Sequence, residues 1–79
     1  MDLELKQLVF VTIERVTGVN PSTLDPSRDV REQVSFDSMQ FVALTAAVEK
    51  ELDVELPLAV MEVSTLDEFL ELIDEALEA

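Results

Sequence analysis

Ser38 is the residue best placed in this sequence to carry a covalently attached group. It follows Asp37 at the expected start of an apolar helix and at the end of a long loop, so its hydroxyl should be within reach of an enzyme. The N-terminus of a helix favours anions, which would stabilise a phosphate ester on this hydroxyl. Taken alone, the Asp37-Ser38 pair is more often an ordinary helix cap, because Asp and Ser commonly stand at the start of helices.

The chain contains no cysteine and no histidine. Their absence removes disulfides, thiol nucleophiles, zinc sites of the usual ligand types and the commonest general base. The spacing and glycine of a calcium-binding EF-hand loop are also missing. We therefore expect no catalytic residue and no metal site, and any thiol chemistry has to be supplied by a cofactor.

Acidic residues dominate the charge, with 18 Asp and Glu against 5 Lys and Arg and a net charge of −13. From Phe41 onward, 11 acidic residues accompany 1 basic residue. Nucleic-acid phosphates repel such a surface, so we expect no nucleic-acid partner and predict partner proteins with basic patches.

The length of 79 residues allows one domain, residues 1–79, with a modest core. No apolar run approaches the roughly 18 residues of a membrane span. The first residues are acidic rather than basic, which does not resemble a secretory signal. We expect a cytoplasmic monomer that does not insert into membranes.

Hydrophobic periodicity predicts helices at 3–16, from 37 or 38 to about 51, and from 64 or 65 to the C-terminus, with a short helix at 58–63. The middle helix is apolar on nearly all sides between Phe41 and Val48, which favours partner contact on one face. Capping boxes are expected at its start and at the start of the last helix. Residues 17–36 are predicted to form a long loop with a helical turn at 29–34, held down by Leu24, Val30 and Val34.

The predicted fold class is therefore all-α, a small antiparallel four-helix bundle of three main helices and a short one, with a long loop between the first two. The apolar stripe of the first helix contains Leu5, Leu8, Val9, Ile13 and Val16, and that of the last contains Leu66, Phe69, Leu70, Ile73 and Leu77.

The segment from residue 34 to residue 57 resembles the signature of acyl carrier proteins, without gaps. The residues that carry the resemblance are Val34-Ser35-Phe36-Asp37-Ser38-Met39, Val42, Leu44, Glu49, Glu51 and Asp53-Val54-Glu55-Leu56-Pro57. In that family an Asp-Ser-Leu motif carries phosphopantetheine, and the following helix ends in an acidic segment and a proline. The order of elements matches more loosely over the whole chain.

The resemblance implies a freestanding carrier rather than an enzyme. A phosphopantetheinyl transferase would move the 4′-phosphopantetheine arm from coenzyme A to Ser38, with Asp37 near the metal-bound phosphate. The thiol of the arm would then hold acyl groups as thioesters for a ketosynthase, acyltransferase or acyl-activating enzyme. The family shields acyl chains between its helices, and the candidate lining residues, which are equally well explained as ordinary core, are Val34, Phe36, Leu44, Val48, Met61 and Phe69.

One face of the middle helix is the candidate docking surface for those partners. The family commonly has acids at the positions of Gln40, Ala43 and Lys50, where this chain has none. We therefore expect docking through small apolar contacts, and a carrier for a specialised pathway, such as polyketide synthesis, rather than bulk fatty acid synthesis; neutral drift explains these changes equally well. At helical spacing this face contains Met39, Val42, Ala43, Ala46, Glu49 and Lys50.

Two other functions stay open from the sequence. One is an aminoacyl carrier, such as a D-alanyl or peptidyl carrier, although peptidyl carriers often have Gly-Gly-His-Ser where this chain has Asp37 before the serine. The other is an acidic interaction domain that receives no modification.

Overall fold

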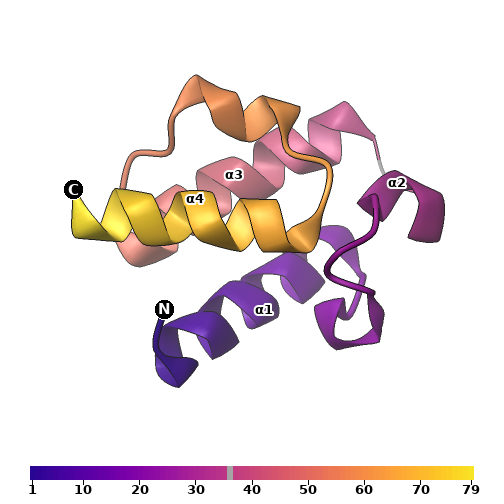
Figure 1. Ribbon diagram of the computed structural model, residues 1–79, viewed down its shortest axis with the longest axis horizontal. Helices are drawn as coiled ribbons and strands as arrows, with labels where there is room; N and C mark the ends of the chain where they lie inside the picture. The colour runs from indigo at the N-terminus through magenta and orange to yellow at the C-terminus, as the bar shows by residue number, and fades with distance from the viewer. Residues whose placement is uncertain (36) are drawn as a thin grey trace.

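The residues that the structure describes form four α-helices, and three of them are long (Figure 1). The structure is a computed structural model and describes residues 1–35 and 37–79. No strand forms within those ranges, so the all-α prediction is confirmed. The helices are α1 (Leu3–Thr17), α2 (Val30–Gln33), α3 (Ser38–Leu52) and α4 (Leu66–Glu78), and 3-10 helices lie at Pro21–Thr23 and Leu58–Glu62.

Each long helix begins with a side-chain cap. Asp2 accepts from a backbone N–H at the start of α1, and both predicted capping boxes are present in α3 and α4. In these boxes Asp37 pairs with Gln40, and Thr65 pairs with Glu68. Because the caps satisfy N–H groups that have no partner inside the helix, they fix where each helix starts.

The C-terminal ends of α1 and α3 use the left-handed region of the backbone. Gly18 ends α1 at a φ of 75°, and its N–H donates to the carbonyl of Glu14 at 2.9 Å. Asp53 ends α3 at a φ of 53°. Glycine adopts this conformation without the steric cost that other residues meet, so Gly18 makes a sharp end to α1.

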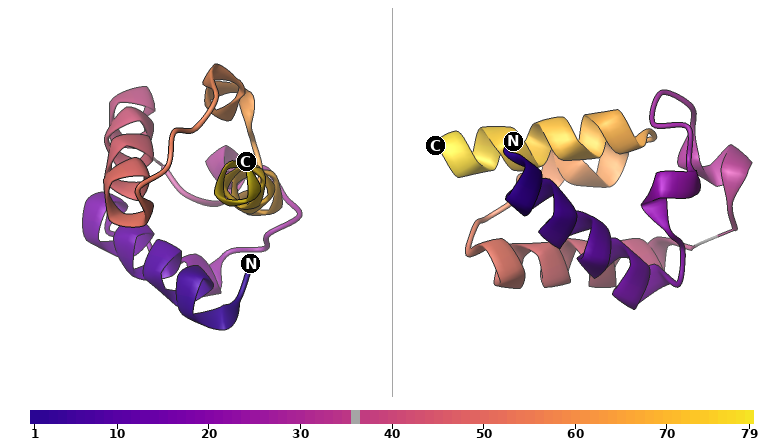
Figure 2. Two further views of the ribbon diagram at one scale, coloured as in Figure 1. Left: turned by 90° about the vertical axis from the view of Figure 1, so that its left-hand side faces the viewer. Right: turned by 90° about the horizontal axis from the view of Figure 1, so that it is seen from below.

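The helix directions follow from the connections. α1 runs opposite to α3, whereas α3 and α4 run in the same direction, because residues 53–65 return the chain along the bundle (Figure 2). The predicted antiparallel arrangement thus holds for α1 against the other two long helices.

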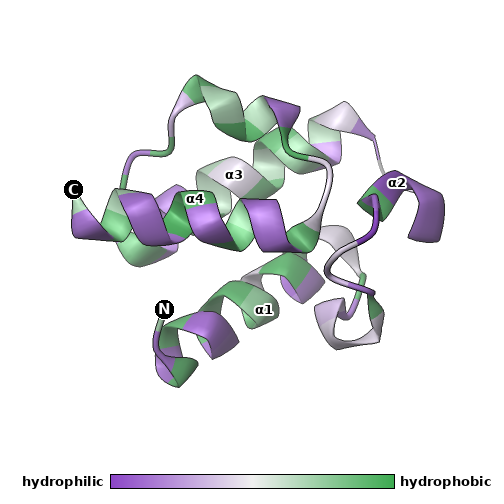
Figure 3. Ribbon diagram, viewed as in Figure 1, coloured by the Kyte–Doolittle hydropathy of each residue, from purple (hydrophilic) through white to green (hydrophobic). Residues whose placement is uncertain are grey.

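The core lies where α1, α3 and α4 face one another. Ile73 is 0% exposed, and Val9 and Val48 are each 1% exposed. The rings of Phe41 and Phe69 meet at 5.8 Å between centroids. The hydropathy colouring shows apolar and polar stretches alternating along α1 and α4, whereas α3 is mainly green and white (Figure 3). The buried core residues are Val9, Ile13, Phe41, Leu44, Val48, Val60, Leu66, Phe69 and Ile73.

The long loop is fastened to the start of α4. The Val30 N–H donates to the Ser64 carbonyl at 2.8 Å, and the Asp67 N–H donates to the Pro26 carbonyl at 3.0 Å. The helical turn predicted at 29–34 is α2. The three residues expected to hold the loop are partly buried, namely Leu24, Val30 and Val34.

The short helix predicted at 58–63 is a 3-10 helix at Leu58–Glu62. The Val60 N–H donates to the Pro57 carbonyl, and the Val63 N–H donates to the Val60 carbonyl. These i to i+3 bonds suit a short segment with one buried residue, Val60, and no side-chain cap. Within the described part of the chain, no helix has the length and apolar character needed to cross a bilayer.

Candidate functional site

Ser38 is the first residue of α3 and is exposed. Beside it, Asp37 Oδ1 accepts from the Gln40 N–H at 2.8 Å, and Gln40 Oε1 accepts from the Asp37 N–H at 3.1 Å. Across residues 1–35 and 37–79, the Ser38 hydroxyl has no hydrogen-bond partner. The cap therefore leaves this hydroxyl available for reaction.

The start of α3 fits a phosphate ester. The first backbone hydrogen bond of this helix runs from the Phe41 N–H to the Asp37 carbonyl, at 3.1 Å. The N–H groups of Ser38 and Met39 precede that bond and have no acceptor among the described residues. Unpaired N–H groups together with the positive end of the helix dipole attract anions.

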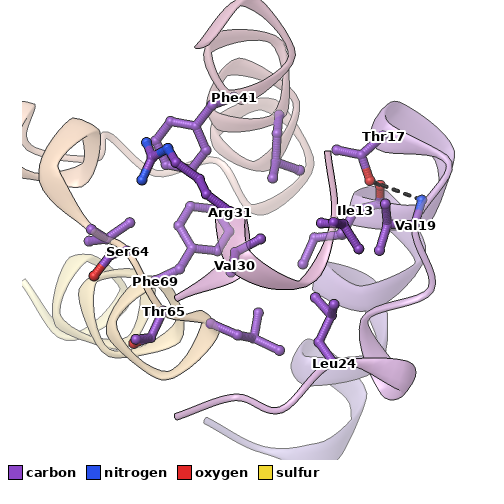
Figure 4. Close-up of a pocket in the computed structure, with 14 residues that line it drawn as sticks. Ile13, Thr17, Val19, Leu24, Val30, Arg31, Phe41, Ser64, Thr65 and Phe69 are labelled. Carbon is purple, nitrogen blue, oxygen red and sulfur yellow. Dashed lines mark hydrogen bonds between the residues drawn. The ribbon is translucent and has the colours of Figure 1, made fainter. Parts of the chain in front are cut away.

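A cavity of about 50 Å³ lies between the loop and the three long helices (Figure 4). It holds roughly one or two water molecules, at about 30 Å³ each. Among residues 1–35 and 37–79, its lining contains one charged side chain, Arg31, and is otherwise mainly apolar. The lining residues are Ile13, Thr17, Val19, Leu24, Val30, Arg31, Val34, Phe41, Leu44, Val63, Ser64, Thr65, Leu66 and Phe69.

Three of the six candidate acyl-pocket residues line this cavity, namely Val34, Leu44 and Phe69. Val48 is 1% exposed in the core, and Met61 is 39% exposed at the surface, so neither belongs to this lining. The sixth candidate, Phe36, lies outside the described residues.

Most of the remaining lining was missed because it comes from segments far apart in the sequence. Ile13 appeared in the sequence as part of an apolar stripe, and Leu24 and Val30 appeared as residues that hold the loop. These residues come together around one cavity because the Val30 N–H bonds to the Ser64 carbonyl. A backbone hydrogen bond between distant segments cannot be predicted from a sequence pattern.

Glu68 organises the cavity wall at the start of α4. Its Oε1 atom accepts from the N–H groups of Ser64 and Thr65, at 3.3 and 3.1 Å, and from both hydroxyls at 3.1 Å. The Ser64 N–H, followed by the two hydroxyls, lowers the pKa of the Glu68 carboxyl below its usual value. One oxygen of this carboxylate is therefore engaged by both capping residues.

The candidate docking residues are largely on the surface. Met39 is 80% exposed, Val42 is 52% exposed, and Ala43, Ala46 and Lys50 are exposed as well. The 3-10 helix contacts α3 and adds Leu58, which is 90% exposed and was not singled out in the sequence.

Glu49 differs from the other docking candidates because its side chain has a structural partner. It is partly buried, and its Oε2 atom accepts from the Leu56 N–H at 2.9 Å. This bond ties the end of α3 to the returning chain. Within the described ranges, no group of three or more His, Cys, Asp or Glu residues could hold a metal ion.

Comparison with known proteins identifies the family. The family model described as phosphopantetheine attachment site matches residues 7–73, a stretch that includes Ser38 and the whole cavity lining. No curated protein and no solved structure matches the chain at a significant level. The prosthetic group of this family is 4′-phosphopantetheine, whose phosphate suits the start of α3. The chain belongs to the family of phosphopantetheine attachment domains.

Proposed function

We propose that this protein is an acyl carrier protein, not itself an enzyme, that carries acyl groups as thioesters on an arm attached to Ser38. The observation that carries the proposal is an exposed hydroxyl at the first residue of α3, on the helix that contributes Phe41 and Leu44 to the cavity. When bound, the prosthetic group supplies the thiol that the chain itself lacks.

The residues around Ser38 support this role. Asp37 keeps the helix start ordered through one carboxylate oxygen, Oδ1. Its other oxygen is left to approach the metal-bound phosphate during transfer, as the resemblance to acyl carriers implies. The N–H groups of Ser38 and Met39 stabilise the phosphate after attachment, an effect of about 0.3–1 kcal/mol for an anion at an exposed helix end.

Intact-mass analysis after incubation with coenzyme A and a broad-specificity phosphopantetheinyl transferase tests the attachment residue. Ser38→Ala removes the hydroxyl, and Ser35→Ala is a matched control because Ser35 is also exposed but precedes the helix. We expect one added arm on the wild type and on Ser35→Ala, and none on Ser38→Ala, with all three folded by circular dichroism. Modification of Ser38→Ala would refute the assignment.

The mainly apolar cavity favours an acyl cargo over an aminoacyl cargo. Burial of each methylene contributes about 0.8 kcal/mol, but an ammonium group is costly to bury without a partner. At about 50 Å³ the cavity has to widen to admit more than a short chain.

Cargo preference can be measured by loading the protein with octanoyl or alanyl groups through the corresponding acyl arms. We expect octanoyl, but not alanyl, to raise the melting temperature and to shift the methyl resonances of Leu44. A larger response to alanyl would instead identify an aminoacyl carrier.

We further propose that partner enzymes dock on an apolar surface made of Met39, Val42, Ala43 and Ala46 of α3 together with Leu58. Beyond the transferase, these partners are a ketosynthase, an acyltransferase or an acyl-activating enzyme with a basic rim and an apolar centre. Docking on such a surface depends on shape more than on long-range attraction, which suits a specialised pathway. Efficient turnover of the holo protein by a housekeeping ketosynthase would remove this part of the proposal.

We place the protein in the cytoplasm as a single domain, where enzymes that use coenzyme A would meet it. We expect it to be monomeric, because copies that each carry a net charge of −13 repel one another. Light scattering at low and at high salt tests the monomer.

A further inference from the structure

Arg31 is the one charged side chain in the cavity lining within residues 1–35 and 37–79. It belongs to α2 and is exposed, whereas the lining residues Leu44 and Phe69 are buried. Figure 4 shows its side chain extending toward Phe41, which lies in the first turns of α3. The guanidinium therefore lies at the mouth of the cavity, and the apolar residues lie deeper.

Arg31 has no ion pair with any described residue, although the chain has a net charge of −13. The other two arginines are paired, Arg15 with Glu51 at 3.3 Å and Arg28 with Glu32 at 3.9 Å. Arg31 is therefore the one arginine without an ion pair among the described residues.

Asp29, Asp37 and Glu68 each use one carboxylate oxygen in the cap of a helix. Asp29 Oδ1 accepts from the backbone N–H of Arg31 at 2.8 Å, as the cap of α2. Glu68 Oε1 accepts from Ser64 and Thr65, and Asp37 Oδ1 accepts from the Gln40 N–H, but none of these three carboxylates forms an ion pair with Arg31. The guanidinium thus keeps its donors available, and such a group binds carboxylates through two parallel hydrogen bonds.

We propose that Arg31 is a specificity-determining residue that binds a carboxylate on the acyl group, so that this carrier favours short acyl groups derived from dicarboxylic acids. This inference rests on the proposed attachment to Ser38. The methylenes of such a group contact the partly buried lining residues Val30 and Val34, and its free carboxylate binds the guanidinium. The cavity volume of about 50 Å³ suits this arrangement, because a short chain with a charged end does not need to enter the core.

The test compares two acyl groups of similar shape on the holo protein. Succinyl carries the carboxylate, and 4-methylpentanoyl replaces it with an isopropyl group. Both are attached with a broad-specificity transferase from the corresponding coenzyme A thioesters, and intact mass confirms loading. The variant is Arg31→Gln, and Arg28→Gln is the matched control because it removes an arginine from the same loop, away from the cavity lining.

Two readouts follow from the contact. Succinyl, but not 4-methylpentanoyl, should shift the Nε–Hε resonance of Arg31, one of only three arginines in the chain. The second readout is the melting temperature of the succinyl form minus that of the 4-methylpentanoyl form. This difference should be about 3 °C larger in the wild type than in Arg31→Gln. Arg28→Gln should retain that difference, and high salt should reduce it.

Equal responses to the two acyl groups would overturn the role of Arg31. So would a shift of the same Nε–Hε resonance on attachment of the unloaded arm, which would assign the guanidinium to the phosphate. If Arg28→Gln also lost the difference in melting temperature between the two acyl forms, that difference would come from the net charge of the chain and not from a contact with Arg31. Failure of either acyl arm to attach to Ser38 would overturn the proposed function as well, and intact mass distinguishes that result from loading without discrimination.

Discussion

Asp37 and Gln40 cap each other at the start of α3. The Gln40 N–H donates to Asp37 Oδ1 at 2.8 Å, and the Asp37 N–H donates to Gln40 Oε1 at 3.1 Å. The pair orders the first turn without using the Ser38 side chain, so the Ser38 hydroxyl stays exposed. One residue therefore stabilises the helix, and its neighbour is left available for chemistry.

Loss of the Asp37 cap should destabilise the fold moderately. Asp37→Ala leaves the Gln40 N–H without its acceptor, and such changes typically cost about 1 kcal/mol, or about 4–8 °C in melting temperature for a domain of this size. Thermal unfolding followed by circular dichroism measures the change. Asp37→Asn keeps a side-chain acceptor and should lose much less. Equal losses in both variants would show that the charge of Asp37, rather than its hydrogen bond, stabilises the helix.

The core should respond sharply to the removal of a single methyl group at Ile73, which is 0% exposed. Ile73→Val should lower the free energy of unfolding by about 0.5–1.5 kcal/mol, because the vacated volume is only partly refilled. Urea unfolding provides the value. Val11→Ala, at a position that is 62% exposed, should change it by no more than about 0.5 kcal/mol. A cost for Val11→Ala as large as that at Ile73 would contradict the assigned core.

Glu68 should contribute to the loss of stability in acid. Its pKa is lowered in the folded chain, chiefly by the Ser64 N–H, so the folded state favours the ionised carboxylate. The contribution is present above the unfolded value, near 4.5, and is lost as the pH falls through the lower folded value. The melting temperature of Glu68→Gln should therefore fall less than that of the wild type between about pH 5 and about pH 3.

Glu71→Gln is the control for that experiment, because it removes the same charge from the exposed side of α4. If Glu71→Gln flattened the acid response as much as Glu68→Gln, the effect would come from net charge and not from the hydrogen bonds around Glu68.

Charge repulsion should make stability depend on salt. The net charge is −13, and the described residues form three ion pairs, so most of the acids have no basic partner. Added sodium chloride should raise the melting temperature by screening repulsion between the acids, and magnesium should do so at lower concentration. A melting temperature that stays constant across ionic strength would show that the acids are too far apart to repel one another strongly.

The long helices could be predicted from the sequence because their signals are local. The capping boxes at Asp37 and Thr65 and the glycine at position 18 fix three helix ends within a few residues. The 3-10 form of Leu58–Glu62 could not be predicted, because a five-residue apolar segment fits either kind of helix. The 3-10 helix at Pro21–Thr23 was not predicted either, because a three-residue segment of Pro, Ser and Thr is typical of a loop.

The cavity was only partly predictable because it depends on contacts between distant segments. Periodicity placed Phe69 in the apolar stripe of the last helix, and the family resemblance suggested Leu44 as a lining residue, but neither could place Arg31 at the mouth. That placement follows from the backbone bond between Val30 and Ser64, since backbone groups pair without regard to side-chain type.

The attachment of the arm to Ser38 is tested most directly by mapping the modified wild-type chain. Trypsin cleavage after Arg31 and Lys50 gives one peptide, residues 32–50, that contains both Ser35 and Ser38. After modification with coenzyme A and a transferase, fragment ions of this peptide should place one phosphopantetheine on Ser38 and none on Ser35. An arm on Ser35, on any residue outside this peptide, or on no residue at all would contradict the account.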